Sequence, residues 1–264
     1  VRKGSFPILM SLSAFLAASL IWRPVRFFKE YAMFSGFSNE TVDFMWGIRF
    51  NNEREWFEAH KDAYLSSFYR PMKALGEELL SFLHQKRPNY GLLCKTTRIY
   101  RDARRLHGRG PYKDNLWFTI EQPSEEWTAR PCFWFELAPE VWSYGMGYYM
   151  SKPLTMAKLR ARICREPKPM EQLTRNLNGQ TEFSLDAINY KRPKAPAPSP
   201  LLEPWFQMKS FSVCHEEKLS EELFSRQIVQ RLQDGYAFLL PYYDYFASLE
   251  GDPDPRDAVL EASL

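Results

Sequence analysis

The chain contains 264 residues, of which 45% are hydrophobic and 16% aromatic, and its formal net charge is +3. This composition excludes a largely disordered chain and allows one large domain or two small ones. The four cysteines are dispersed, without C-x-x-C spacing or paired histidines nearby, which favours reduced thiols over a disulfide framework or a zinc site.

The first 32 residues differ from the rest of the chain. Residues 6–22 carry no charge, which is typical of a signal peptide or a short membrane anchor. The run is short for a spanning helix, and the basic residues after it favour a cytoplasmic main domain. The codons for Lys29 and Glu30 can form the purine run of a bacterial ribosome-binding site. Two codons lie between this run and Met33. We therefore expect residues 1–32 to be a leader: a mis-assigned start, with Met33 as the true start, or a signal or membrane segment.

The leader carries the excess positive charge. Without it the chain has 30 basic and 31 acidic residues, a net charge of −1. The domain thus lacks the global positive charge of a typical nucleic-acid binder, which argues against such a partner without excluding it. We expect a cytoplasmic protein without a membrane partner if Met33 is the start, and a membrane-anchored one if residues 6–22 are an anchor. The sequence does not indicate an oligomeric state.

Helices are predicted at the start of the domain. Ser38 precedes an apolar-periodic run that predicts a helix over residues 40–50. A second helix is predicted from Glu53, and Pro71 should kink it or separate it from a continuation to Leu83.

Short, aromatic and alternating segments in the middle of the chain predict strands over 96–102, 115–121, 132–137 and 141–149. The following predicted elements are helices over 153–165 and 169–177, a proline-rich connector over 191–200, a helical turn over 201–206, a strand over 211–215, and a long helix from Ser220 to about 249 that Pro241 perturbs. This order predicts an α+β fold, a mainly antiparallel sheet of about four to six strands flanked by N-terminal and C-terminal helices. The single domain should cover residues 33–250, with a frayed tail over 251–264.

The most distinctive segment is rich in arginine. Between residues 98 and 113, six basic residues stand against one acid, Asp102. Such a cluster is costly unless acids from elsewhere in the fold or an anionic ligand lie within it. We expect either a site for a small anionic or phosphate-bearing ligand, or an ion network with acids of the second helix. The residues expected to bind the anion are Arg98, Arg101, Arg104, Tyr112 and Lys113.

Other functions stay open at this point. Glu55 and Glu58 are candidate catalytic bases beside the arginines, although such residues more often cap a helix and complement its dipole. The aromatic residues of the strands form either a stacking platform beside the basic segment or ordinary core; they are Phe133, Trp134, Phe135, Trp142, Tyr144, Tyr148 and Tyr149. A scaffold or protein-interaction domain is a further alternative. We expect no cofactor and no metal site, since the sequence contains no phosphate-binding glycine loop, dinucleotide fingerprint or H-E-x-x-H motif.

From Phe34 to about Leu249 the chain resembles domain-of-unknown-function family 2461, a group of conserved hypothetical proteins. The matching segments occur in the family's order: FSGF (34–37), NNEREWFEAHKDAY (51–64), RIYRDAR (98–104), GPYKDN (110–115), YKRPKAP (190–196) and LEPWFQMKSF (202–211). The resemblance implies a fold and no activity. The chain departs from the family where a lysine-bearing loop before PYK reads LHGRG, and where His60 replaces a common Asn. Neither His60 nor His107 can therefore be carried over as a family catalyst.

Overall fold

The computed structural model describes residues 33–106, 108–124 and 130–257. The expected leader, including the apolar run over 6–22, lies outside the described residues, as does the end of the expected tail from residue 258. None of the described helices is both long and apolar enough to cross a membrane.

The segment before the sheet is helical, as the sequence predicts. Its elements are α1 (Asn39–Phe50), α2 (Arg54–Ala59), α3 (Lys61–Ala63), a π-helical turn (Tyr64–Tyr69) and α4 (Arg70–Lys86). At the start of α1 the backbone N–H of Ser38 donates to Thr41 Oγ1 at 3.1 Å. This bond satisfies one of the polar groups that a helix start leaves unpaired.

Pro71 does not break the second helical segment, because the backbone adopts a wider π-helical turn immediately before the proline. Pro71 lies in the first turn of α4, and its ring nitrogen cannot donate to the carbonyl of Ser67, four residues earlier. The hydroxyl of Thr41 donates to this carbonyl instead, at 2.6 Å. The π-helical turn before α4 provides the local widening that accommodates the proline ring.

Six antiparallel strands form one sheet in the order β1-β2-β3-β4-β6-β5, which confirms the α+β prediction. The strands are β1 (Leu93–Thr96), β2 (Leu116–Glu121), β3 (Cys132–Leu137), β4 (Val141–Gly147), β5 (Ser184–Asn189) and β6 (Met208–Lys218). The predicted strand over 96–102 is wrong, because the ladder of β1 ends at Thr96. Among the described residues beyond it, Tyr100 and Tyr112 form an isolated antiparallel bridge. The sequence prediction missed β5, a short edge strand with a largely exposed surface.

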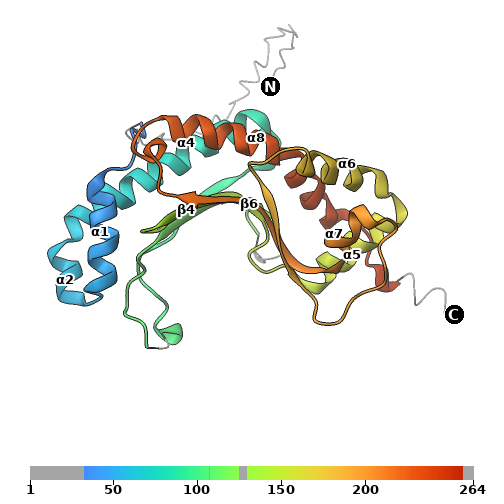
Figure 1. Ribbon diagram of the computed structural model, residues 1–264, viewed down its shortest axis with the longest axis horizontal. Coiled ribbons are helices and arrows are strands. Elements are labelled where there is room, and N and C mark those ends of the chain that lie inside the picture. Colours follow the sequence, from blue (N-terminus) through green and yellow to red (C-terminus); the bar gives the residue numbers. More distant parts are fainter. Residues whose placement is uncertain (1–32, 107, 125–129, 258–264) are drawn as a thin grey trace, which may run out of the picture. The chain divides into compact units, whose positions relative to one another are not determined.

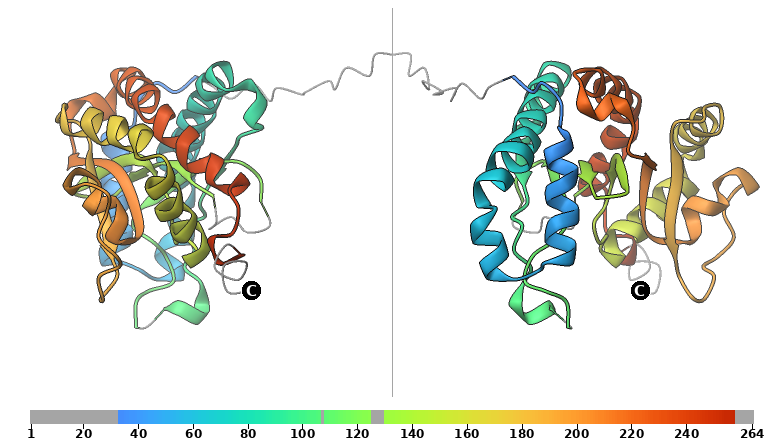
Figure 2. Two further views of the ribbon diagram at one scale, coloured as in Figure 1. Left: turned by 90° about the vertical axis from the view of Figure 1, so that its right-hand side faces the viewer. Right: turned by 60° about the vertical axis from the view of Figure 1, so that its left-hand side comes forward.

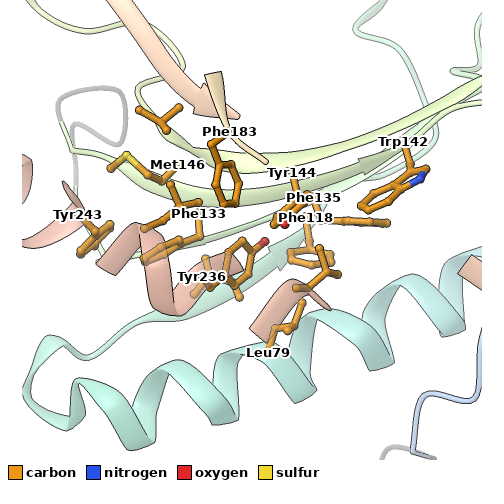
Figure 3. Close-up of a cluster of buried hydrophobic side chains, with 14 of the residues drawn as sticks. Leu79, Phe118, Phe133, Phe135, Trp142, Tyr144, Met146, Phe183, Tyr236 and Tyr243 are labelled. Atoms are coloured by element: carbon orange, nitrogen blue, oxygen red, sulfur yellow. The ribbon is translucent and has the colours of Figure 1, made fainter. Parts of the chain in front are cut away.

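One face of the sheet carries the aromatic core. Figure 3 shows Leu79 of α4 and Tyr236 of the C-terminal helix α8 (Gln227–Ala247) directed at the rings on this face. The rings include Phe118, Phe133, Phe135 and Tyr144, which are all fully buried. The Tyr236 hydroxyl donates to the backbone carbonyl of Trp134 at 3.0 Å. The helices α4 and α8 thus cover this face and are joined to the sheet by both packing and hydrogen bonding.

The opposite face is concave and is free of described helices along β2, β3 and β4 (Figure 1). The helices α1 and α2 lie at one end of the sheet and those of residues 153–207 at the other, as Figures 1 and 2 show. The second group comprises α5 (Pro153–Arg165), α6 (Pro167–Asn178) and α7 (Glu203–Gln207). The open face is therefore accessible along the middle of the sheet.

The long terminal helix begins later than predicted. A 3-10 turn over Glu221–Phe224 follows Ser220, and α8 begins only at Gln227, continuing through Pro241. Beyond α8, Arg162 of α5 binds Asp252 with two hydrogen bonds of 2.7 Å. The described start of the tail is therefore fixed to the domain at Asp252.

Candidate functional site

A groove of about 860 Å³ lies on the open face of the sheet. This volume is within the range of sites that bind small molecules and cofactors. Because side chains alternate along a strand, the residues between the core positions of β2 and β3 form the floor of the groove. The floor includes Trp117 and Thr119 of β2 and Trp134 and Glu136 of β3, with Thr97, Asn115, Glu121, Tyr149 and Ser212 among the remaining lining residues.

The arginine-rich segment forms a loop whose two ends meet at one end of this groove. The N–H of Arg101 donates to the carbonyl of Pro111, and that of Lys113 donates to the carbonyl of Ile99, both at 2.8 Å. Thr97, just before the loop, and Asn115, just after it, both line the groove. The bend at Gly108, where φ is +79°, allows the loop to reverse.

Asn52 ties this loop to the junction between α1 and α2. Its side-chain oxygen accepts from the N–H of Tyr112, and its side-chain nitrogen donates to the Tyr112 carbonyl, both at 2.9 Å. Gly110 lies against the same side chain, and a Cβ there would overlap Asn52. The Tyr112 ring is buried and stacks on Phe57 of α2 with a centroid distance of 4.4 Å. Tyr112 therefore positions the loop and does not line the groove.

Lys113 lies beside Trp117, one of the floor residues of the groove. Its Nζ lies 4.1 Å from the centre of the Trp117 ring. Burial and the nearby guanidinium groups of Arg101 and Arg98 lower its pKa from 10.5 to about 8. Glu136 attracts the ammonium group through space, but no acid among the described residues forms a salt bridge with Lys113.

The two neighbouring arginines differ in how far they are already paired. Arg101 donates from Nε to the carbonyl of Tyr112 at 2.8 Å, and its outer nitrogen is 3.8 Å from Asp114. Asp114 is held more closely by Arg49 of α1, at 2.6 Å. Arg98 is exposed and forms no salt bridge within the described part of the chain. Arg98 and Lys113 are therefore cations to which no acid of the described residues is directly bound.

Arg104 does not join this group. It lies in a short 3-10 turn, its side chain is 87% exposed, and Asp102 binds it at 2.8 Å. The segment thus supplies one internal ion pair, between Arg104 and Asp102. Arg98 and Arg101 instead lie close enough to Lys113 to lower its pKa. The ion network also differs from the one expected from the sequence. Asp114 lies near Arg101, whereas the acids of α2 form no salt bridge with these arginines.

Two carboxylates line the groove. Glu136 accepts a hydrogen bond from the side-chain amide of Asn115, and burial raises its pKa. Glu121 is buried and pairs with Lys95 at 2.5 Å. The candidate bases Glu55 and Glu58 lie elsewhere: both are exposed on α2, and Glu58 pairs with Lys61 at 3.2 Å.

The predicted aromatic platform divides into two sets. Phe133, Phe135, Trp142 and Tyr144 are fully buried in the core. Trp134, Tyr148 and Tyr149 instead line the groove, although Tyr148 is itself buried. Trp117, which the sequence interpretation missed, lines it as well. Side chains along β2 and β3 point alternately to the two faces of the sheet. This alternation separates core residues from groove residues once the face that α4 and α8 cover is known.

The fold and the groove define an α+β domain with a ligand-sized hollow on the open face of an antiparallel sheet. A family model described as "Conserved hypothetical protein (DUF2461)" matches residues 40–245, so the chain belongs to this family. A search of curated proteins found no match. The family description names no activity.

Proposed function

We propose that this protein binds a small anionic ligand, such as a carboxylate or a phosphate ester, at the loop end of the groove. Lys113 and Arg98 supply the charge, and Arg101 adds a guanidinium group beside them. The observation that carries the proposal is the position of Lys113: it is half-buried over Trp117, near two arginines, and forms no salt bridge with the described acids.

The electrostatics of this arrangement favour an anion. Three cations that repel one another in a partly buried site destabilise the folded protein, and a bound anion relieves that repulsion. The strength of attraction is greater here than on an open surface, because the groove walls exclude part of the water. Arg98 can bind a phosphate or carboxylate with two parallel hydrogen bonds, while Lys113 acts as a point charge.

The catalytic hypothesis built on Glu55 and Glu58 gains no support from this geometry. Both side chains lie outside the groove lining, and neither pairs with Arg98 or Arg101. The scaffold hypothesis requires arginines that are already paired, and Arg98 has no acid partner among the described residues. Anion binding is therefore the function that the groove supports best.

Isothermal titration calorimetry with inorganic phosphate and with glucuronate at low salt tests the proposal. We expect binding by the wild type and a loss of at least tenfold in affinity for Lys113→Met. Lys61→Met is the matched control, because Lys61 is an exposed lysine paired with Glu58, and its affinity should equal that of the wild type. Absence of binding by every anion, or equal binding by Lys113→Met, would contradict the proposal.

A further inference from the structure

We propose that the natural ligand is an acidic carbohydrate of at least two rings, with its single charged group at Lys113 and its neutral rings along the groove floor. This inference rests on the proposed anion site and extends it from a charge to a class of molecule. Three features of the groove carry it: its length, its indole faces and the distribution of its charges.

The groove is longer than a simple anion requires. Trp117 and Glu121, at the two ends of β2, both line it. Four residue steps along an antiparallel strand span about 13 Å. Lys113 lies over Trp117 and so marks one end of this distance. An inorganic anion would fill only that end, and the remaining floor needs an extended ligand.

Two half-buried tryptophans form part of the floor. Trp117 of β2 pairs with Glu136 of β3, and Thr119 pairs with Trp134, so the two tryptophans are diagonal neighbours on adjacent strands. Diagonal side chains on one sheet face are within reach of each other when they are large. The face of an aromatic ring is electronegative and attracts the weakly positive C–H groups on one side of a sugar ring.

The polar groups of the floor favour a ligand with many hydroxyl groups. Glu136 and Glu121 are acceptors placed along the groove, and Thr119 adds a hydroxyl between them. The carboxylate of Glu136, which forms no salt bridge with a described cation, repels a second or third negative charge, which disfavours polyphosphates and the backbone of nucleic acids. Hydroxyl donors of neutral sugar rings satisfy the same carboxylates. Lys95 also lines the groove but is paired with Glu121, so the cations at the groove that form no salt bridge with a described acid are Lys113 and Arg98, at the other end.

Calorimetry with matched probes tests this inference: glucuronate, an aldobiouronic acid with one uronate and one neutral ring, the corresponding neutral disaccharide, and adenosine monophosphate. We expect the aldobiouronic acid to bind about tenfold more tightly than glucuronate, a difference that one added stacked ring can supply. Trp134→Ala should remove this advantage, so that this variant binds the aldobiouronic acid and glucuronate with similar affinity. Trp46→Ala is the control, because Trp46 stacks on Phe50 of α1 outside the groove lining.

The outcomes separate the two proposals. Binding of glucuronate and the aldobiouronic acid with equal affinity would overturn the carbohydrate assignment and leave the anion site intact. Tighter binding of adenosine monophosphate would also overturn it, in favour of a nucleotide. Failure of every anionic probe, inorganic phosphate included, would overturn the anion site itself. Thermal unfolding of Trp134→Ala and of Trp134→Phe establishes that the variants are folded, and the phenylalanine variant should retain part of the advantage.

Discussion

The ammonium nitrogen of Lys113 lies 4.1 Å from the centre of the Trp117 ring, at the end of the sheet groove. The indole face attracts the cation, but this attraction is worth only about 0.5–2 kcal/mol and does not replace a carboxylate partner. Lys113 is therefore held in place by an aromatic ring while its charge stays available to a ligand. This arrangement is the basis of the proposed anion site.

The first prediction concerns the cost of this charge to stability. Replacement of Lys113 by Met removes a half-buried cation that Arg101 and Arg98 repel. We expect the free energy of unfolding in urea to rise by about 1 kcal/mol, after allowance for solvent screening. A variant that is more stable than the wild type and yet binds anions weakly would show that the loss of binding is not caused by unfolding. A fall in stability would show that Lys113 has a structural partner.

The second prediction concerns pH. The pKa of Lys113 is about 8 in the folded protein against 10.5 ordinarily, so the folded protein releases this proton first. The destabilising effect is fully present below pH 8 and disappears as the pH rises from about 8 to 10.5, where the unfolded chain binds more protons. The difference in unfolding free energy between wild type and Lys113→Met should shrink over this range. Anion affinity should fall over the same range, because the lysine loses its charge.

Denaturation and calorimetry at closely spaced pH values test this prediction. The comparison with Lys113→Met cancels the ionisation of the buried tyrosines, which both proteins share. A difference between the two proteins that stays constant from pH 7 to 10 would show that the pKa of Lys113 is not lowered.

The third prediction concerns the attachment of the loop. Asn52→Ala removes both hydrogen bonds to the backbone of Tyr112. The Tyr112 N–H then lacks its partner, while the carbonyl keeps the bond from Arg101 Nε. We expect a loss of about 1–3 kcal/mol in unfolding free energy and weaker anion binding, since Lys113 follows directly. Gly110→Ala should act in the same way, because its Cβ displaces Asn52. Asn51→Ala is the control: Asn51 is an exposed neighbour whose side chain bonds only within α1.

The sequence predicts the helices and central strands well because their signals are local. Strand β3 and helix α5 begin and end at the residues that the patterns indicate. The errors lie where tertiary contacts decide. The start of α8 moves from Ser220 to Gln227 because the intervening residues form a 3-10 turn, with Leu223 buried. The segment after Thr96 leaves the sheet because Asn52, far away in sequence, binds the returning strand of the loop.

The candidate site is predictable only in part for the same reason. Clustered charge in the sequence identifies the segment around Arg98 and Lys113, but it does not distinguish Arg104, which its neighbour Asp102 neutralises. It also cannot show that Trp117 and Trp134 face outward. Their orientation depends on which face α4 and α8 cover, and this is a property of the assembled fold.

The fourth prediction concerns the packing of α8 on the sheet. A Cβ at Gly235 would lie 2.5 Å from atoms of the buried Tyr144 ring. Although alanine favours a helix by about 1 kcal/mol, we expect Gly235→Ala to destabilise the protein by about 1–3 kcal/mol because of overpacking. Gly251→Ala is the control, since its Cβ would meet no atom within 4 Å. Chemical denaturation measures both, and equal stability of the two variants would contradict the close approach of α8 to β4.

The fifth prediction concerns an ion network on the other side of the sheet. Arg231 of α8 binds Glu182 at 3.1 Å, Glu217 at 3.0 Å and Glu222 at 2.9 Å. Removal of this single cation leaves three acids close together. We therefore expect Arg231→Met to lower the free energy of unfolding by about 2 kcal/mol, less than for a fully buried pair because these side chains are partly exposed.

A surface ion pair within one helix provides the comparison. Arg175 pairs with Glu171 four residues earlier on α6, and its side chain is 60% exposed. Arg175→Met should cost no more than about 0.5 kcal/mol. Similar losses for Arg231→Met and Arg175→Met in thermal denaturation would show that the network contributes no more than an ordinary surface pair.

The most direct test of the account is a titration of the Trp117 indole N–H signal by nuclear magnetic resonance. Trp117→Phe assigns the signal, glucuronate is the titrant, and the buried Trp205 is an internal reference. We predict a saturable shift of the Trp117 signal in the wild type, no shift for Trp205, and no shift for Trp117 in Lys113→Met. A Trp117 signal that does not move with glucuronate, or that moves equally in Lys113→Met, would contradict anion binding at this end of the groove.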